Sequence, residues 1–132
     1  MRSARDVFHL AIPARDLDAA QQFYVTGLGC HLARRYHDRI TLDFFGDQLV
    51  CHLSDRVDDD PDLYPRHFGV TFRREADFQA VLKLARMREL PFFRQPDRRF
   101  EGMVEEHWTF VLRDPSSNLI EFKHYLDPRM MY

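Results

Sequence analysis

The sequence predicts an α+β fold of two tandem βαβββ modules, forming a cup-shaped mixed sheet with the helices on its outer face. Two observations lead to this prediction. Strand-like and helix-like stretches follow the order strand, helix, three strands, and the same order returns in the second half. Each half has one helix with which to cover its sheet, so the two modules are expected to share a core. The length of 132 residues fits a single domain, with modules at about 5–54 and 65–126.

The first module begins with an expected strand at Val7–Pro13, ended by a proline that lacks a backbone donor. Asp16 is the expected N-cap of the following helix. The helix is indicated by apolar residues at helical spacing: Leu17, Ala20, Phe23 and Tyr24. Three short strands complete the module: His31–Tyr36, Ile40–Phe45 and Gln48–Leu53. The acidic, proline-containing stretch Ser54–Pro65 is the expected linker.

The second module repeats this order with one longer connection. Its expected elements are a strand at Arg66–Phe72, a helix at Glu75–Arg88, and strands at Pro91–Gln95, His107–Asp114 and Asn118–His124. The connection at about 96–105 has two interpretations. It is a lid, with Gly102 as its hinge and Phe100 excluding water, or an exposed loop without a catalytic role.

The composition excludes several classes of protein. Hydrophobic residues make up 45% of the chain and charged residues 30%, as in a globular domain. The net charge of −2 provides no general attraction for nucleic acid or an anionic membrane. No apolar run approaches the roughly 20 residues that span a bilayer. The two cysteines, Cys30 and Cys51, are too few for a disulfide scaffold, so buried free thiols in a cytoplasmic protein are expected.

The alternation of side chains along the strands places three ionisable groups on one side. In the first strand of each module, bulky apolar residues share one face: Phe8, Leu10 and Ile12, then Phe68, Val70 and Phe72. The opposite faces carry His9 and His67. In the last strand, Glu121 points away from Ile120 and Phe122. If helices cover the bulky faces, the two histidines and Glu121 all face the concave side.

Two imidazoles and one carboxylate form a ligand set for a divalent metal, with coordination positions left open for substrate. An unpaired carboxylate in an interior strand costs several kcal/mol, and a metal at Glu121 removes that cost. The alternative is that His9 and His67 are ordinary partly buried histidines and that Glu121 pairs with Lys123 or an arginine. The matching places of the three residues in the repeat favour the metal.

Three segments carry a family resemblance that covers nearly the whole chain: FHLAIPARDLDAAQQFY, RHFGVTF and DPSSNLIEF. In this order, and at this length, the sequence resembles the vicinal oxygen chelate superfamily, which includes glyoxalases, fosfomycin-resistance proteins, bleomycin-binding proteins and extradiol dioxygenases. The resemblance implies two βαβββ modules forming a cup around a metal site. It also implies that His9, His67 and Glu121 fill the positions at which metal-binding members keep ligands.

Two departures from the family pattern bear on turn geometry and function. Ser117 stands where members often have glycine, so a residue with positive φ is expected in that turn. Val50 falls opposite Glu121 when the modules are aligned, so the first module supplies no carboxylate. Glyoxalase I-like enzymes use a fourth protein ligand there. A site with three protein ligands resembles those of extradiol dioxygenases and fosfomycin-modifying enzymes instead. No potassium loop or cluster of phosphonate-binding cations is evident, which argues against the fosfomycin branch.

The resemblance and the ligand set together predict a metal-dependent enzyme. The first expectation is extradiol-type dioxygenation of a catechol-like or other chelating substrate with Fe(II), although Mn, Ni, Co or Zn also suit these ligands. The alternatives are a lyase, isomerase or thiol transferase on the same scaffold, a metal-free drug-binding protein, and a structural or interaction domain. Open sheet edges predict a homodimer.

Further site residues are expected on the same faces of the strands. His52 and His107 are candidates for acid–base catalysis, because histidine titrates near neutral pH. Gln48, Thr109 and Phe100 are candidates for substrate binding. The alternative is that these are polar residues at the mouth of the sheet, with no part in the chemistry.

Overall fold

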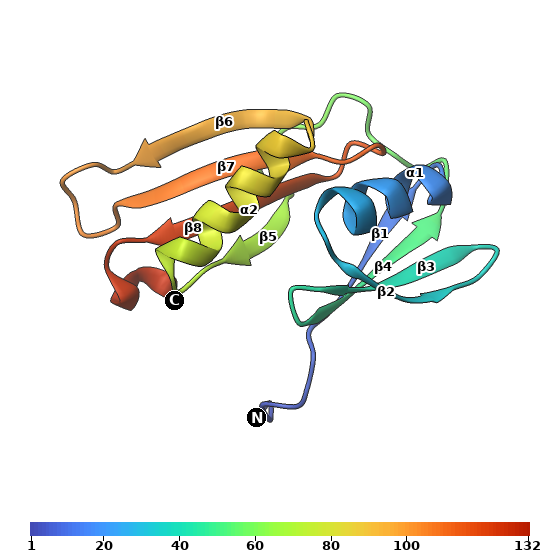
Figure 1. Ribbon diagram of the computed structural model, residues 1–132, viewed down its shortest axis with the longest axis horizontal. Helices are drawn as coiled ribbons and strands as arrows, with labels where there is room; N and C mark the ends of the chain where they lie inside the picture. The colour runs from blue at the N-terminus through green and yellow to red at the C-terminus, as the bar shows by residue number, and fades with distance from the viewer. The chain divides into compact units, whose positions relative to one another are not determined.

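The computed structural model describes residues 1–132 and contains two four-stranded mixed sheets, each with its own helix (Figure 1). Contacts divide the chain into two compact units. The first comprises residues 1–59 and 115–118, and the second comprises residues 60–114 and 119–132. The expected α+β architecture of two βαβββ modules is confirmed. None of the helices has the length and apolar character needed to cross a bilayer.

The first unit contains β1 (His9–Ala14), α1 (Leu17–Gln21), the π-helical turn η1 (Gln22–Gly27), β2 (His31–Arg35), β3 (Arg39–Phe44) and β4 (Asp47–Leu53). Its strand order is β1-β4-β3-β2, with β1 parallel to β4 and the other pairs antiparallel. Asp16 is the N-cap of α1, because its carboxylate accepts hydrogen bonds from the backbone of Asp18 and Ala19. The expected helix therefore begins where predicted, and its last turns widen into a π-helix.

The second unit contains β5 (Phe68–Thr71), α2 (Glu75–Met87), β6 (Phe92–Arg99), β7 (His107–Arg113), β8 (Leu119–Tyr125) and the short 3-10 helix η2 (Pro128–Met131). Its strand order is β5-β8-β7-β6, with the same single parallel pair as in the first sheet. Phe110 and Phe122 are fully buried and stack at 5.1 Å between ring centroids. Phe78 of α2 packs on Phe110 at 5.3 Å, which places the helix over this apolar face.

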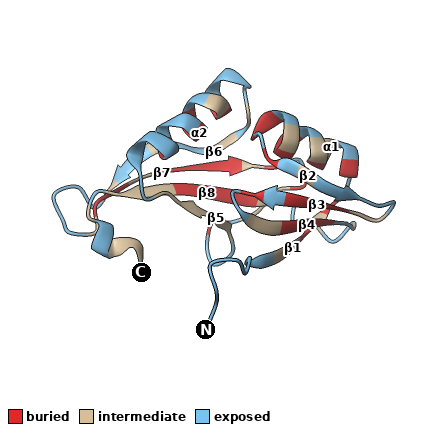
Figure 2. Ribbon diagram, turned by 60° about the horizontal axis from the view of Figure 1, so that its bottom comes forward, coloured by how far each residue is buried: buried red, intermediate tan, exposed pale blue.

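Burial follows the alternation that the sequence predicts. Most of the buried strand residues lie in the central strands of each sheet (Figure 2). In the first sheet, the residues beneath the helix are almost wholly buried: Ile40, Leu42, Leu49 and Cys51. The opposite face of β4 carries Gln48, Val50 and His52, in line with the polar face expected there.

The two modules repeat in register as well as in element order. Ala11, two residues after His9, pairs with Val50, and Gly69, two residues after His67, pairs with Glu121. Val50 therefore occupies in the first sheet the position that Glu121 occupies in the second. A Cβ at residue 69 would overlap the backbone carbonyl oxygen of Glu121, so only glycine permits this close approach of β5 to β8.

Three local predictions are corrected. Phe8 lies outside β1 and is 55% exposed, because the strand begins only at His9. The strand expected at Arg66–Phe72 is shorter and leaves His67 just before β5. The loop expected at 96–105 is shorter, because β6 continues to Arg99 in pairing with β7, and a turn from residue 100 to 106 remains.

The expected strained turn is confirmed, because Ser117 has a φ of 65°. This turn belongs to the first unit, where Ser116 accepts a hydrogen bond from the backbone of Arg15 at 2.9 Å. The side chain of Asn118 donates to the carbonyl oxygen of Pro13 at 2.9 Å. The segment that joins β7 to β8 is thus bonded to the end of β1.

Candidate metal centre

His67 and Glu121 form the central pair of the candidate site. The Nε2 atom of His67 lies 2.8 Å from Oε2 of Glu121. Glu121 is 9% exposed, and its other oxygen, Oε1, accepts a hydrogen bond from the hydroxyl of Thr109 at 2.7 Å. The pairing of Glu121 with Lys123 or an arginine, the alternative weighed above, is wrong. The carboxylate is instead held between an imidazole and a hydroxyl.

The surroundings of His67 leave one ring nitrogen for a cation. Its Nδ1 lies 2.7 Å from the carbonyl oxygen of Leu63, which only accepts hydrogen bonds, so Nδ1 carries the proton. Nε2 then faces a carboxylate oxygen that also acts as an acceptor. Two acceptors cannot share a short contact without a positive charge between them, either a proton or a metal ion. His67 and Glu121 are residues that would hold a divalent metal, which would supply this positive charge.

His9 has the same arrangement in the first unit. Its Nδ1 lies 2.6 Å from Oε1 of Gln48, the residue with which it pairs across β1 and β4. The amide oxygen is an acceptor, so Nδ1 is the donor and Nε2 keeps a free lone pair. Histidines that bind metals usually donate their second N–H in this way to a carbonyl or carboxylate. Both histidines are therefore held as the tautomer that suits a metal ligand at Nε2.

The structure brings together part of the expected ligand set. His67 and Glu121 meet in the second unit, whereas His9 belongs to the first unit. The structure shows no group of three His, Cys, Asp or Glu side chains in positions suited to a metal. The set of three ligands stays a prediction.

The other expected site residues have varied surroundings. His52 is exposed near the end of β4, on the same face as Val50. His107 is buried, and its ring packs on Tyr125 at 4.7 Å and lies 5.9 Å from Phe100. Its Nδ1 lies 2.9 Å from the carbonyl oxygen of Glu105, so Nε2 is the ring atom left to accept a proton. Gln48 and Thr109, expected to bind substrate, are bonded to His9 and Glu121 and orient those residues.

The turn between β6 and β7 is held by a buried carboxylate. Glu106 accepts a hydrogen bond from the backbone of Gly102 at 2.8 Å and pairs with Arg98 at 2.6 Å. The Gly102 hydrogen bond, aided by the charge of Arg98, holds the pKa of Glu106 below its usual value. Phe100 at the start of the turn is 48% exposed, and Gly102 has a φ of 79°.

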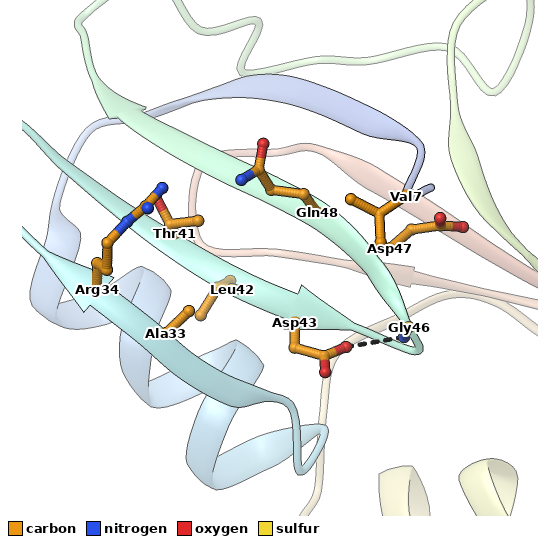
Figure 3. Close-up of a pocket in the computed structure, with 9 residues that line it drawn as sticks. All are labelled: Val7, Ala33, Arg34, Thr41, Leu42, Asp43, Gly46, Asp47 and Gln48. Atoms are coloured by element: carbon orange, nitrogen blue, oxygen red, sulfur yellow. Dashed lines mark hydrogen bonds between the residues drawn. The ribbon is translucent and has the colours of Figure 1, made fainter. Parts of the chain in front are cut away.

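The residues that sequence reasoning missed line a pocket in the first unit. The pocket has a volume of about 230 Å³ and lies against β2, β3 and β4 (Figure 3). Arg34, Thr41 and Asp43 line it beside Gln48. Alternation would have assigned Thr41 and Asp43 to this face. Arg34 reaches it only through a β-bulge, for which the sequence has no clear signal.

Comparisons with known proteins agree with this architecture. The family model of the glyoxalase/bleomycin resistance protein/dioxygenase superfamily matches residues 6–122. A search of curated proteins found no significant match. A protein from Alicyclobacillus acidocaldarius, described as a glyoxalase/bleomycin resistance protein/dioxygenase, is similar in crystal structure, with 67% identity, a TM-score of 0.97 and full coverage of both chains.

Two more distant structures share the fold. A lactoylglutathione lyase from Agrobacterium tumefaciens has 21% identity and a TM-score of 0.67, over 90% of this chain and 92% of that chain. The fosfomycin resistance protein FosX from Listeria monocytogenes has 13% identity and a TM-score of 0.72, over 98% of this chain and 99% of that chain. The family match and the similar structure at 67% identity show that the chain belongs to the glyoxalase/bleomycin resistance protein/dioxygenase superfamily.

Proposed function

We propose that this protein is a metal-dependent enzyme in which His9, His67 and Glu121 hold one divalent ion. The observation that carries the proposal is the 2.8 Å contact between Nε2 of His67 and Glu121, with Nδ1 of the same ring already bonded to Leu63. The hydrogen bond to Gln48 sets the equivalent tautomer of His9, which supports the assignment of His9 as the third ligand.

The donor set suits Fe(II) in particular. Two imidazoles and one carboxylate, with the remaining positions open, are typical of non-haem Fe(II) oxygenases. Val50 stands at the place where a fourth ligand would lie, so the first module leaves that position to other molecules. A bound ion would supply Lewis acidity to two adjacent oxygens of the substrate and, as Fe(II), the reducing capacity that dioxygen chemistry requires. We therefore propose extradiol-type dioxygenation of a catechol-like substrate.

Residues of the chain itself would orient the ligands and move protons. Thr109 and Gln48 hold Glu121 and His9 in their ligating orientations. His107 is the better placed of the two candidate bases, because its Nδ1 is bonded and its Nε2 is free to accept a proton from a substrate hydroxyl. The phenyl ring of Phe100 beside it would restrict the access of water.

The test begins with anaerobic purification and elemental analysis, followed by oxygen uptake with a panel of catechols. We expect stoichiometric iron and oxygen uptake that depends on catechol. Tightly bound zinc or nickel without oxygen uptake would instead favour lyase or isomerase activity. A protein that binds catechols but no metal would contradict metal-dependent catalysis and favour a drug-binding role.

The variant Glu121→Ala tests the ligand assignment. We expect it to fold and to lose the metal, because the carboxylate supplies the one anionic ligand of the set. Glu101→Ala is the matched control, since this glutamate is exposed in the turn after β6. Elemental analysis and far-UV circular dichroism give the two readouts. Full metal occupancy in Glu121→Ala would remove this residue from the site.

We also propose that two copies of the chain associate. Each sheet has two edge strands, β1 and β2 in the first and β5 and β6 in the second, and unpaired edges favour pairing with another chain. Light scattering coupled to size exclusion would give the mass of a dimer. A mass near 15.8 kDa, that of one chain, would contradict this proposal.

A further inference from the structure

The pocket of the first unit has a free cation at one end. Arg34 and Arg35 are neighbours in β2, yet they have different environments. Arg35 donates to Asp18 and Gln21 at 2.6 Å each, on the side of the sheet covered by α1. The side chain of Arg34 forms no hydrogen bond or ion pair within the chain, and it lines the pocket on the opposite side. Its guanidinium group is thus available to a ligand.

A β-bulge directs Arg34 into this pocket. The pairing of β2 with β3 shifts between Leu32 and Arg34, so that Arg34 faces Thr41 and Arg35 faces Ile40. Without the shift, Arg34 would stand opposite Ile40, on the buried face beneath the helix. Bulges commonly re-aim a side chain next to a functional site. Here the bulge moves the charge of Arg34 to the open face that also carries His9 and Gln48.

Two further donors lie beside Arg34. The amide oxygen of Gln48 is bonded to His9, which leaves the amide N–H groups for a ligand. In Figure 3 the amide nitrogen of Gln48 lies on the side of the pocket where Arg34 and the hydroxyl of Thr41 are found. A guanidinium, an amide and a hydroxyl therefore converge on one end, and all three can donate to an oxyanion.

The other end of the pocket carries negative charge. Asp43 accepts a hydrogen bond from the backbone of Gly46, and Asp47 is bonded to Arg2 and to the backbone of Phe8. Arg2 neutralises Asp47, but no cation pairs with Asp43, whose charge disfavours an anionic ligand at this end and favours one negative charge over two. A planar carboxylate matches the fork of the guanidinium group and carries a single charge.

We propose that this pocket binds a carboxylate of the substrate through Arg34, Thr41 and Gln48. The proposal deepens the function proposed above and rests on it for the rest of the substrate. Gln48 links the pocket to the proposed metal centre. Its amide oxygen orients His9, and its amide nitrogen is the group that meets the carboxylate. The substrate class is then a catechol-like compound that also bears a carboxylate, rather than a neutral catechol.

Four probe molecules test the proposal by NMR titration of the backbone amides. They are 3,4-dihydroxybenzoate, its neutral analogue 4-methylcatechol, benzoate and phenylphosphonate. We expect wild type to bind 3,4-dihydroxybenzoate about tenfold more tightly than 4-methylcatechol, as for a hydrogen bond to a charged group. Benzoate should perturb the amides around Arg34, Thr41 and Gln48, with or without metal.

Arg34→Gln should lose this preference for the carboxylate, whereas binding of 4-methylcatechol should stay unchanged. Arg39→Gln is the matched control, because Arg39 lies on β3 and pairs with Asp38 without lining the pocket. Equal affinity of wild type and Arg34→Gln for benzoate would overturn the proposal. Tighter binding of phenylphosphonate than of benzoate would overturn the choice of a carboxylate.

The same titrations separate this inference from the metal-dependent function. Benzoate that binds through Arg34 in a protein without metal affinity would support the carboxylate site, and the failure would then lie with the proposed metal centre. Stoichiometric metal together with no effect of Arg34→Gln on any probe would overturn the carboxylate site alone.

Discussion

Single hydrogen bonds determine which atoms of the candidate site are available to a metal. Nδ1 of His67 is bonded to Leu63 and Nδ1 of His9 to Gln48, so that Nε2 of His67 faces Glu121 and Nε2 of His9 has no partner. Sequence alternation predicted that these histidines and Glu121 lie opposite the bulky apolar faces of their strands. It could not predict the partner of each ring, because the carbonyl oxygen of Leu63 lies in an irregular segment before β5. Residue identity therefore indicates candidate ligands, and local folding selects the tautomers of the two histidines.

The variant Thr109→Val tests how much the hydrogen bond from Thr109 to Glu121 contributes to metal affinity. The variant keeps the shape of the side chain but leaves Oε1 of the buried Glu121 without its donor. We expect metal affinity to fall about 10- to 100-fold, as is usual when an outer hydrogen bond to a ligand is lost. A competition titration with a chelator gives the affinity. Thr71→Val is the control on the same face of the second sheet, and equal affinities of the two variants would contradict the role of Thr109.

At the scale of elements, the parallel pair of each module positions the candidate ligands. The order of strands and helices was predictable because alternation and helical spacing are strong over these lengths. The extension of β6 to Arg99 was not, because Pro96, Asp97 and the arginines resemble a loop in composition. Their strand conformation comes from pairing with β7, a tertiary contact that local sequence does not contain.

Gly69→Ala tests how closely β5 must approach β8. The added Cβ would overlap backbone atoms of Glu121, which cannot move as the end of a side chain can. We expect a loss of about 1–3 kcal/mol in the free energy of unfolding, together with weaker metal binding as Glu121 shifts. Thermal unfolding followed by circular dichroism measures the first effect. Thr71→Ala, in the same strand, controls for changes in strand propensity, and a Gly69→Ala variant as stable as this control would contradict the close approach.

At the scale of the whole molecule, the tandem repeat explains both the predicted fold and the asymmetry of the site. The repeat carries a histidine at matching places, and pairing register shows that Val50 and Glu121 are equivalent. The two modules share this arrangement of strands but differ in the candidate site residues that they carry. The first supplies His9, the bulge at Arg34 and a pocket, whereas the second supplies His67, Glu121 and Thr109. Because the two modules supply different residues, we predict that neither module by itself binds both the metal and the substrate.

The ligand set proposed here makes metal binding a property of both units. An ion that binds the folded state stabilises it, by about 4 kcal/mol when its concentration is a thousand times Kd. Because His9 belongs to one unit and His67 and Glu121 to the other, we expect the metal to slow amide hydrogen exchange in β1 as well as in β5 and β8. His9→Ala should lose the protection of β1 and most of the metal affinity, whereas His31→Ala, the exposed histidine of β2, should behave as wild type. Metal-dependent protection confined to the second unit in the wild-type protein would show that His9 is not a ligand.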